Sequence, residues 1–309
     1  MNVLRIVINP HIGGYGHRVR CNLIAEEIMK LRSNAKISFL DRKDDPLYNE
    51  DWTEFKRVRG GINRTIELIR STCLVEDSAF IRDFQRKIYS KLGKIVTITN
   101  PNIESEATKI KHFFRYNDLI IIPYPKDIFP FPNDLIEFKK KLLWVNPVLN
   151  LPPGGIKPKK IEKPTIYITA SRGREKIMAM VEKVKKDLPV RFIEPSFRDE
   201  KEYFSSILSA TAVITQGTTV MFELCYLGIP QICIPFNKEQ LLVAKKLSEM
   251  GIMKYIPLEK LVQEEFKKTV TEVINESIPR SDLRDKGRDF IQKSGAIDIA
   301  KAIVELAEL

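Results

Sequence analysis

Short apolar runs rich in β-branched residues alternate with segments of helical periodicity along most of the chain. In the first half these runs span residues 3–8, 36–40, 95–99 and 119–122. Between the first two, apolar side chains recur every three or four residues over 17–32, which is the spacing of one helix face. Strands joined through helices pair in parallel, because the helix carries the chain back to the same end of the sheet. The pattern therefore predicts an α/β fold with parallel sheets.

The same alternation restarts after a stretch rich in proline and glycine at residues 142–164. Such a composition is typical of a linker. A chain of 309 residues also exceeds the length of about 250 to 300 residues at which one hydrophobic core stops growing. We therefore expect two domains, residues 1–150 and 151–309. In the second, strands are predicted at 165–169, 190–193, 212–215 and 231–234, and helices at 175–187, 200–209 and 220–227.

The chain carries a formal net charge of +11. An excess of this size suggests an anionic partner such as a nucleotide diphosphate, a nucleic acid or an acidic membrane, although a solvated basic surface would give the same count. The four cysteines lack the spacing of a zinc site, so reduced thiols are expected. No stretch approaches 18 apolar residues and no signal sequence is recognisable. We expect a cytoplasmic protein, with peripheral membrane contact left open.

A glycine-rich turn with Gly14 and Gly16 follows the first predicted strand, and His17 begins the next helix. Glycine lets backbone approach a ligand closely, and a helix N-terminus favours anions. The turn alone is a weak signal, because it has neither dinucleotide-fingerprint nor P-loop spacing. Histidine titrates near neutral pH, so His17 is a candidate general base, with a surface or capping role as the alternative. His11 and His112 are expected to be structural.

Two further turns lie between a predicted strand and a predicted helix in the second half. Ser171 and Gly173, with Arg172 or Arg174 nearby, would suit a phosphate, or would form an ordinary strand-to-helix turn with a serine cap. Gly217 begins the other turn, which continues through Thr218 and Thr219.

Glu223 lies one helical turn beyond Thr219, where its carboxylate could accept hydrogen bonds from ribose hydroxyls. The alternative is a buried acid among apolar neighbours, which is costly without a partner.

The combination of Gly217, Glu223, Gly228-x-Pro230, Pro235 and Gln240 resembles the donor-binding signature of the GT-B glycosyltransferases. It is most similar to the family 28-like branch that contains the N-acetylglucosaminyl transferase of peptidoglycan synthesis. The resemblance implies two Rossmann-like, doubly wound parallel-sheet domains facing a cleft. The first would bind the acceptor and the second the nucleotide-sugar, and the last helix would cross back to the first domain.

The resemblance also assigns roles to particular residues. Glu223 would hold the ribose, the turn at Gly217 the diphosphate, and Gln240 the sugar. Ser171 and Gly173 would match the family's second diphosphate turn, although Ala170 replaces its usual first glycine. Backbone near Phe197 would read the base. The expected substrate-binding residues are Gly14, Gly16, Arg20, Ser171, Gly173, Arg174, Phe197, Gln216, Gly217, Thr218, Thr219, Glu223, Glu239 and Gln240.

At the N-terminus, the pattern from Gly14 to Cys21 departs from the peptidoglycan enzyme. It is similar to the pattern of the UDP-sugar hydrolase of pseudaminic acid synthesis. In both groups the histidine faces the scissile sugar linkage, so the resemblance makes His17 the catalytic residue and leaves the reaction open.

We expect a hexosyl- or N-acetylhexosaminyl-transferase that moves a sugar from a UDP-sugar to a hydroxyl acceptor, without cofactor or metal. The acceptor could be a glycan, a lipid-linked sugar or a small molecule. The segment 126–132 could form an exposed apolar loop suited to a lipid-linked acceptor, or a plain core-packing loop. The alternatives are a nucleotide-sugar hydrolase and a non-catalytic scaffold that binds anions or nucleic acid. Of the possible partners, nucleic acid fits least well.

Overall fold

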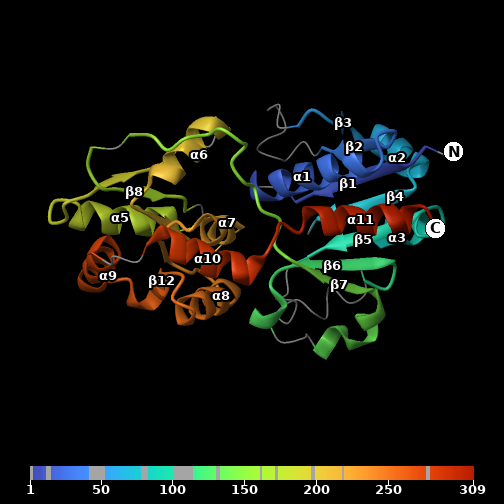
Figure 1. Ribbon diagram of the computed structural model, residues 1–309. Helices are drawn as coiled ribbons and strands as arrows, with labels where there is room; N and C mark the ends of the chain where they lie inside the picture. Colours follow the sequence, from blue (N-terminus) through green and yellow to red (C-terminus); the bar gives the residue numbers. More distant parts are fainter. Residues whose placement is uncertain are drawn as a thin grey trace. The chain divides into compact units, whose positions relative to one another are not determined.

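The computed structural model describes residues 3–11, 15–41, 53–77, 83–99, 114–129, 133–160, 162–170, 173–195, 199–217, 219–275 and 279–309. The chain divides into two compact units. The N-terminal unit comprises Met1–Val148 together with Ser294–Leu309, and the C-terminal unit comprises Leu149–Lys293. Figure 1 shows each unit as a sheet with helices on both faces.

The N-terminal unit is built on a parallel sheet of seven strands in the order β3-β2-β1-β4-β5-β6-β7. After β3 the chain returns to pair β4 with the free side of β1, and then continues outward to β7. The β1–β4 junction is therefore the point where strand order reverses, and ligands of open α/β sheets bind at the carboxyl edge of such a junction. The strands are β1 (Arg5–Pro10), β2 (Lys36–Leu40), β3 (Lys56–Val58), β4 (Cys73–Asp77), β5 (Lys94–Ile98), β6 (Leu119–Pro123) and β7 (Leu142–Val145).

Helices cover both faces of this sheet. Alternate residues of a strand point to opposite faces. Cys73 and Val75 thus join the core under α1 (Tyr15–Leu31) and α11 (Ala296–Ala307), while Leu74 joins the core under α2 (Gly61–Arg70) and α3 (Asp83–Tyr89). Two 3-10 segments, η2 (Lys126–Ile128) and η3 (Asn133–Lys141), lie between β6 and β7.

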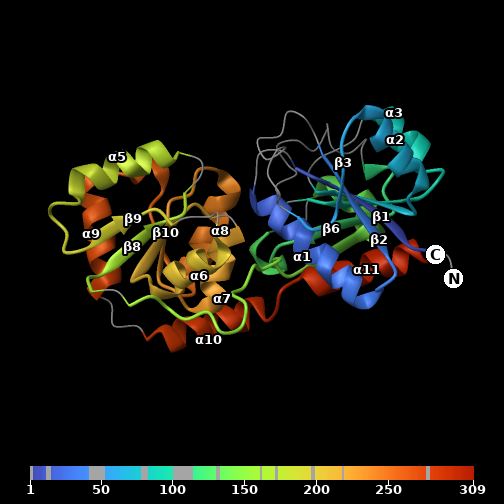
Figure 2. The same cartoon turned by 90° about the horizontal axis from the view of Figure 1, so that it is seen from above.

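The C-terminal helix α11 packs along α1 in the N-terminal unit, and both views show the two side by side (Figures 1 and 2). Ile299, Ile303 and Val304 of α11 share a buried cluster with Ile24 and Ile28 of α1. Because burying an aliphatic side chain of this size contributes about 1.5 to 3 kcal/mol, this apolar seam accounts for the return of the chain end to the first sheet.

The C-terminal unit contains five parallel strands in the order β12-β11-β10-β8-β9, with the reversal between β8 and β10. The apolar faces of α5 and α9 cover one side of the sheet, and α6 and α7 cover the other. The strands are β8 (Thr165–Ile168), β9 (Arg191–Ile193), β10 (Ala212–Thr215), β11 (Gln231–Cys233) and β12 (Lys254–Tyr255). The helices are α5 (Arg174–Val184), α6 (Glu200–Ser209), α7 (Thr219–Leu227), α8 (Lys238–Glu249), the 3-10 turn η4 (Leu258–Lys260), α9 (Gln263–Asn275) and α10 (Arg280–Ile291).

The predicted fold class, two doubly wound parallel-sheet units, is confirmed. Four of the observed strands are not predicted from the sequence: β3, β4, β7 and β12. The linker predicted at 142–164 is wrong for its first four residues, because residues 142–145 form β7 and pair with β6. The sequence also predicts a helix near 104–114, a segment that lies almost wholly outside the described residues. Ile128 and Phe129 of the 126–132 loop are buried, which is the core-packing alternative.

A testable consequence concerns the contact between α10 and α7. A Cβ atom on Gly287 would lie 2.0 Å from the carbonyl oxygen of Cys225, which is backbone and cannot turn away. We expect Gly287→Ala to lower the free energy of unfolding by about 1 to 3 kcal/mol, measured by denaturant titration. Gly61→Ala is the control, because nothing lies within 4 Å of that position, and it should not destabilise. Equal effects of the two changes would contradict the close approach.

Candidate functional site

The carboxyl edge of the β1–β4 junction carries a buried carboxylate beside the first helix. Asp77 ends β4, in register with Pro10 of β1, and its side chain is fully buried. It points to the same face as Cys73 and Val75, which is the face that α1 covers. His17 and Arg20 lie in the first turns of α1, three residues apart, so both side chains reach Asp77.

Asp77 accepts several contacts at once. Nε of Arg20 donates to its Oδ2 at 3.0 Å, Nη2 of Arg20 donates to Oδ1, and the Cys21 thiol lies 3.4 Å from Oδ2. Burial alone would raise the pKa of the Asp77 carboxyl, but the charges and hydrogen bonds of Arg20 and His17 outweigh it and hold the pKa below its usual range. The carboxylate is therefore ionised throughout the physiological range.

The ionised carboxylate acts in turn on its neighbours. Burial would lower the pKa of the Arg20 guanidinium, yet the adjacent carboxylate raises it above its usual value. The Cys21 thiol has its pKa raised, first by burial and then by the charge of Asp77. Cys21 is thus a protonated thiol, which donates to Asp77 and is unsuited to act as a nucleophile.

Two groups compete for Nδ1 of His17. The Oδ2 atom of Asp77 lies 3.3 Å from Nδ1, and Nη2 of Arg20 lies 2.9 Å from it. A guanidinium can only donate, so the Arg20 contact needs a lone pair on Nδ1, whereas the Asp77 contact needs a proton there. With the proton on Nδ1, Nε2 carries the lone pair and His17 can accept a proton from a substrate. The His17 side chain is 32% exposed, so a ligand can reach it.

His11, which follows β1, stacks near His17 with ring centroids 4.9 Å apart. The sequence predicts a structural role for His11 and does not identify Asp77. The available signal for Asp77 was the apolar run Cys73–Val75 ending in two acids, since a charged residue at the carboxyl end of a buried parallel strand lies where ligands bind.

In the C-terminal unit, two glycine turns meet at the carboxyl edge of the sheet. Gly173 follows β8 with φ of 61°, and Gly217 follows β10 with φ of 80°, a region that favours glycine. A Cβ on Gly173 would lie 1.8 Å from the ring of Phe236, and one on Gly217 would lie 3.0 Å from Cβ of Gln240. The turns after β8, β10 and β11 are therefore in contact, and only glycine fits two of them.

The turn that opens α8 is fixed by side chains. Asn237 caps the helix, because its Oδ1 accepts from the backbone N–H of Gln240 at 2.8 Å. The Oε1 atom of Gln240 in turn accepts from the backbone N–H of Phe236 at 2.7 Å. The start of α8 thus lies beside the starts of α5 and α7, and helix N-termini at one edge present N–H groups suited to an anion such as a diphosphate.

Glu223 lies on the buried side of α7. It is 7% exposed, and its Oε1 accepts from the backbone N–H of Asn150 at 3.1 Å. Burial raises the pKa of Glu223 to about 7, and the hydrogen bond from Asn150 offsets only part of this. The carboxylate thus has a protein partner, and its predicted contact with a ribose stays a prediction.

The remaining predicted residues are placed as follows. The guanidinium of Arg174 pairs with Glu194, with Nη2 2.5 Å from Oε2. Gln216 and Glu239 are buried next to the turns, Thr219 begins α7, and Gly16 in the first turn of α1 has open space around it. Gly14, Ser171, Phe197 and Thr218 lie outside the described residues. The structure brings Gly173, Gly217 and Gln240 together, and brings His17 to Arg20.

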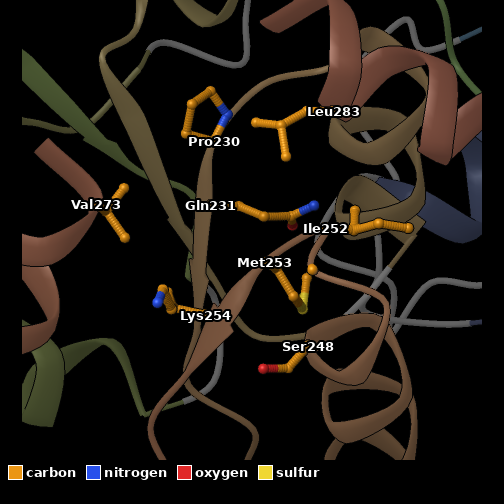
Figure 3. A pocket seen from close by; sticks show the side chains of 9 residues that line it. Pro230, Gln231, Ser248, Ile252, Met253, Lys254, Val273 and Leu283 are labelled. Atoms are coloured by element: carbon orange, nitrogen blue, oxygen red, sulfur yellow. The ribbon is translucent and has the colours of Figure 1, made fainter. Parts of the chain in front are cut away.

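A cavity of about 150 Å³ lies elsewhere in the C-terminal unit (Figure 3). Pro230 precedes β11 and Lys254 begins β12, and both line the cavity together with Leu283 of α10. It therefore opens at the amino edge of the sheet, whereas the glycine turns lie at the carboxyl edge. This cavity is not part of the candidate site.

In the described part of the chain, no group of three or more His, Cys, Asp or Glu side chains is arranged to hold a metal ion. Among the described residues there is also no helix with the length and hydropathy to cross a membrane.

The structure is similar along its whole length to sugar-transferring enzymes. The spinosyn forosaminyltransferase SpnP superposes with a TM-score of 0.71 at 11% identity, covering 100% of both chains. MurG of Acinetobacter baumannii gives 0.64 at 12% identity, over 98% of this chain and all of MurG. The glycosyltransferase VinC, solved in complex with dTDP, gives 0.68 at 9% identity, over 99% of this chain and 100% of VinC.

The chain has the GT-B glycosyltransferase fold. The sequence itself matches no family model and no curated protein. At identities of 9 to 12% the likeness establishes the architecture, and the chemistry has to be argued from the residues at the two carboxyl edges.

The raised pKa of Glu223 has a measurable consequence. Because its folded-state pKa of about 7 exceeds the ordinary value of 4.5, the folded protein binds this proton more tightly, and stability is lost as pH rises through that window. Glu223→Gln keeps an acceptor for Asn150 and does not titrate. Between about pH 5 and pH 8 the variant should gain about 2 to 3 kcal/mol relative to wild type in urea unfolding. A stability difference that does not change with pH would show that folding does not raise the pKa of Glu223.

Proposed function

We propose that the protein is a glycosyltransferase that moves a hexosyl or N-acetylhexosaminyl group from a nucleotide-sugar, a UDP-sugar first among them, to a hydroxyl acceptor. The observation that carries the proposal is the contact between His17 and the ionised Asp77 at the carboxyl edge of the β1–β4 junction. A histidine held by a buried carboxylate is the arrangement of a general base.

The N-terminal unit would supply the general base. Asp77 accepts the Nδ1 proton of His17, which leaves the Nε2 lone pair to take the proton of the acceptor hydroxyl. The acceptor oxygen then bonds to the anomeric carbon of the donor. The bond between that carbon and the diphosphate breaks, and the diphosphate leaves with the bonding electrons. No step needs an oxidant or a metal redox change.

The C-terminal unit would bind the nucleotide-sugar donor. The backbone of the Gly173 and Gly217 turns and the N-termini of α5, α7 and α8 would bind the diphosphate, and would stabilise its growing negative charge as it leaves. Gln240 would reach the sugar with the amide nitrogen of its side chain, since its Oε1 is used by Phe236. Glu223 would hold the ribose after exchanging its contact with Asn150.

A second reaction, hydrolysis of the nucleotide-sugar, is favoured by one observation. Arg20 and Cys21 belong to the sequence pattern that resembles the hydrolase and differs from the peptidoglycan enzyme. Both contact Asp77, so this difference lies in the same cluster as His17. In that reaction His17 would take a proton from water. Release of free sugar from UDP-sugars with no acceptor present, at a rate that acceptors do not raise, would establish hydrolysis and exclude transfer.

Nucleotide binding can be measured directly. UDP, UDP-sugars and dTDP should raise the melting temperature by several degrees at 100-fold excess over Kd, since such binding adds about 2.7 kcal/mol. Gly217→Ala should abolish this shift by displacing Gln240. Gly155→Ala is the matched control, because Gly155 also has a positive φ but open space around it, and it should retain the shift. A full shift in Gly217→Ala would exclude that turn as the diphosphate site.

The base can be tested once a donor and acceptor pair is found. His17→Ala should lower kcat by about 10² to 10⁴-fold, because proton transfer from the acceptor is lost. Asp77→Asn should give a large part of this loss, because an amide can donate to Nδ1 and favours the wrong tautomer. Asp41→Asn provides the control, since Asp41 is another buried carboxylate, paired with Arg57 and Arg59 in the same unit. Full activity of His17→Ala would rule out His17 as the base.

A further inference from the structure

Gln231 in β11 carries a buried amide group that the fold satisfies at one end only. The residue is 1% exposed. Its Nε2 donates to the carbonyl oxygen of Met221 at 3.2 Å and lies 3.1 Å from Sγ of Cys225, both in α7. Because a carbonyl oxygen can only accept, this contact fixes which end of the amide is the nitrogen. The other end is Oε1, and within the described part of the chain no group donates a hydrogen bond to it.

The unpaired oxygen belongs to the cavity at the amino edge of the second sheet. Gln231 is one of the residues that line this cavity. Figure 3 shows its amide end directed among the side chains of Ile252, Met253 and Leu283. A buried acceptor without a partner destabilises a fold, and in native proteins such a group usually meets ordered water or a ligand. The cavity is therefore where the partner of Gln231 has to be found.

The wall around the amide is mainly apolar. Its apolar residues are Pro230, Ile252, Met253, Val273 and Leu283. The volume is about 150 Å³, which is the size of a cavity that takes one benzene molecule. A buried water needs about two to four polar partners, so water bound to the amide oxygen would leave most of this wall without contacts. An organic molecule with an apolar body fills the space better.

Two further polar residues line the cavity, Ser248 of α8 and Lys254 of β12. The ammonium of Lys254 lies 3.6 Å from Oε2 of Glu272 in α9, so its charge already has a carboxylate beside it. An anionic ligand would have to compete with Glu272. A neutral ligand therefore suits the cavity better, and exposed Gly251 in the lining shows that the cavity is open to solvent.

We propose that this cavity binds a neutral aromatic molecule of benzene size that carries one hydrogen-bond donor. The donor would bind Oε1 of Gln231, and the ring would pack against Ile252, Met253 and Leu283. A methionine sulfur makes favourable contacts with aromatic rings and its flexible side chain adapts to their shape. The site lies at the amino edge of the sheet, so it is distinct from the glycine turns proposed for the diphosphate.

The test is isothermal titration of the full chain with phenol and with toluene, which has a methyl group in place of the donor hydroxyl. We expect saturable binding of both. In Gln231→Met the ratio of the toluene Kd to the phenol Kd should fall about ten-fold, because the acceptor is lost and the ratio cancels the difference in hydrophobicity. Toluene binding by this variant shows that its cavity is intact. Gln263→Met, which changes an exposed amide on α9, should keep the wild-type ratio.

A second variant tests the location. Leu283→Trp should weaken binding of both ligands at least about ten-fold, because the larger ring occupies the cavity. Leu242→Trp is the matched control, since Leu242 is 49% exposed and does not line the cavity, and it should bind as wild type. The proposal is overturned by an absence of saturable binding to the wild type, by an unchanged ratio in Gln231→Met, or by wild-type affinity in Leu283→Trp. These readings require neither nucleotide binding nor sugar transfer.

Discussion

The buried carboxylate of Asp77 is the interaction on which the arrangement of the N-terminal edge depends. A fully buried charge is tolerated only when opposite charge and hydrogen bonds compensate its lost hydration. Arg20 supplies the charge and Cys21 a further donor, and both come from α1. The first turns of α1 are thereby fixed against β4, and this brings His17 to the same carboxylate. A requirement of stability therefore also positions the residue proposed as the base.

The C-terminal edge is organised by close backbone approach instead of charge. Gly173 and Gly217 have positive φ, and side chains from the start of α8 occupy the space that a Cβ would need. The turns after β8, β10 and β11 are thus held in contact through Phe236 and Gln240. The two edges suit different tasks, because a fixed histidine and carboxylate can move a proton, whereas a surface of backbone donors can bind an anion. In the proposed sugar transfer, the N-terminal edge would accept the proton of the acceptor and the C-terminal edge would bind the diphosphate.

The outer helices of the N-terminal unit differ in the use of their apolar residues. Both α11 and α2 have an apolar stripe at helical spacing, yet α11 buries it against α1 and α2 turns it to solvent. The core beneath α2 is closed by Leu68 together with Tyr89 of α3, so the isoleucines are not needed there.

The sequence by itself determined the fold class, the glycine turns and the place of His17 at a helix start. Each of these follows from local rules, namely the alternation of strand and helix periodicities and the need for glycine where backbone takes positive φ. The short strand β4, whose end carries Glu76 and Asp77, has no such period, so its place beside β1 could not be read from the sequence.

Only the tertiary structure decided which distant residues meet. Asp77 lies 57 residues from Arg20, and Glu223 lies 73 residues from its partner Asn150. Whether α2 turns its stripe inward or outward is likewise set by what fills the core beneath it. Periodicity shows that a helix has an apolar face, whereas the direction of that face, and the partner of a buried charge, depend on packing between segments far apart in the chain.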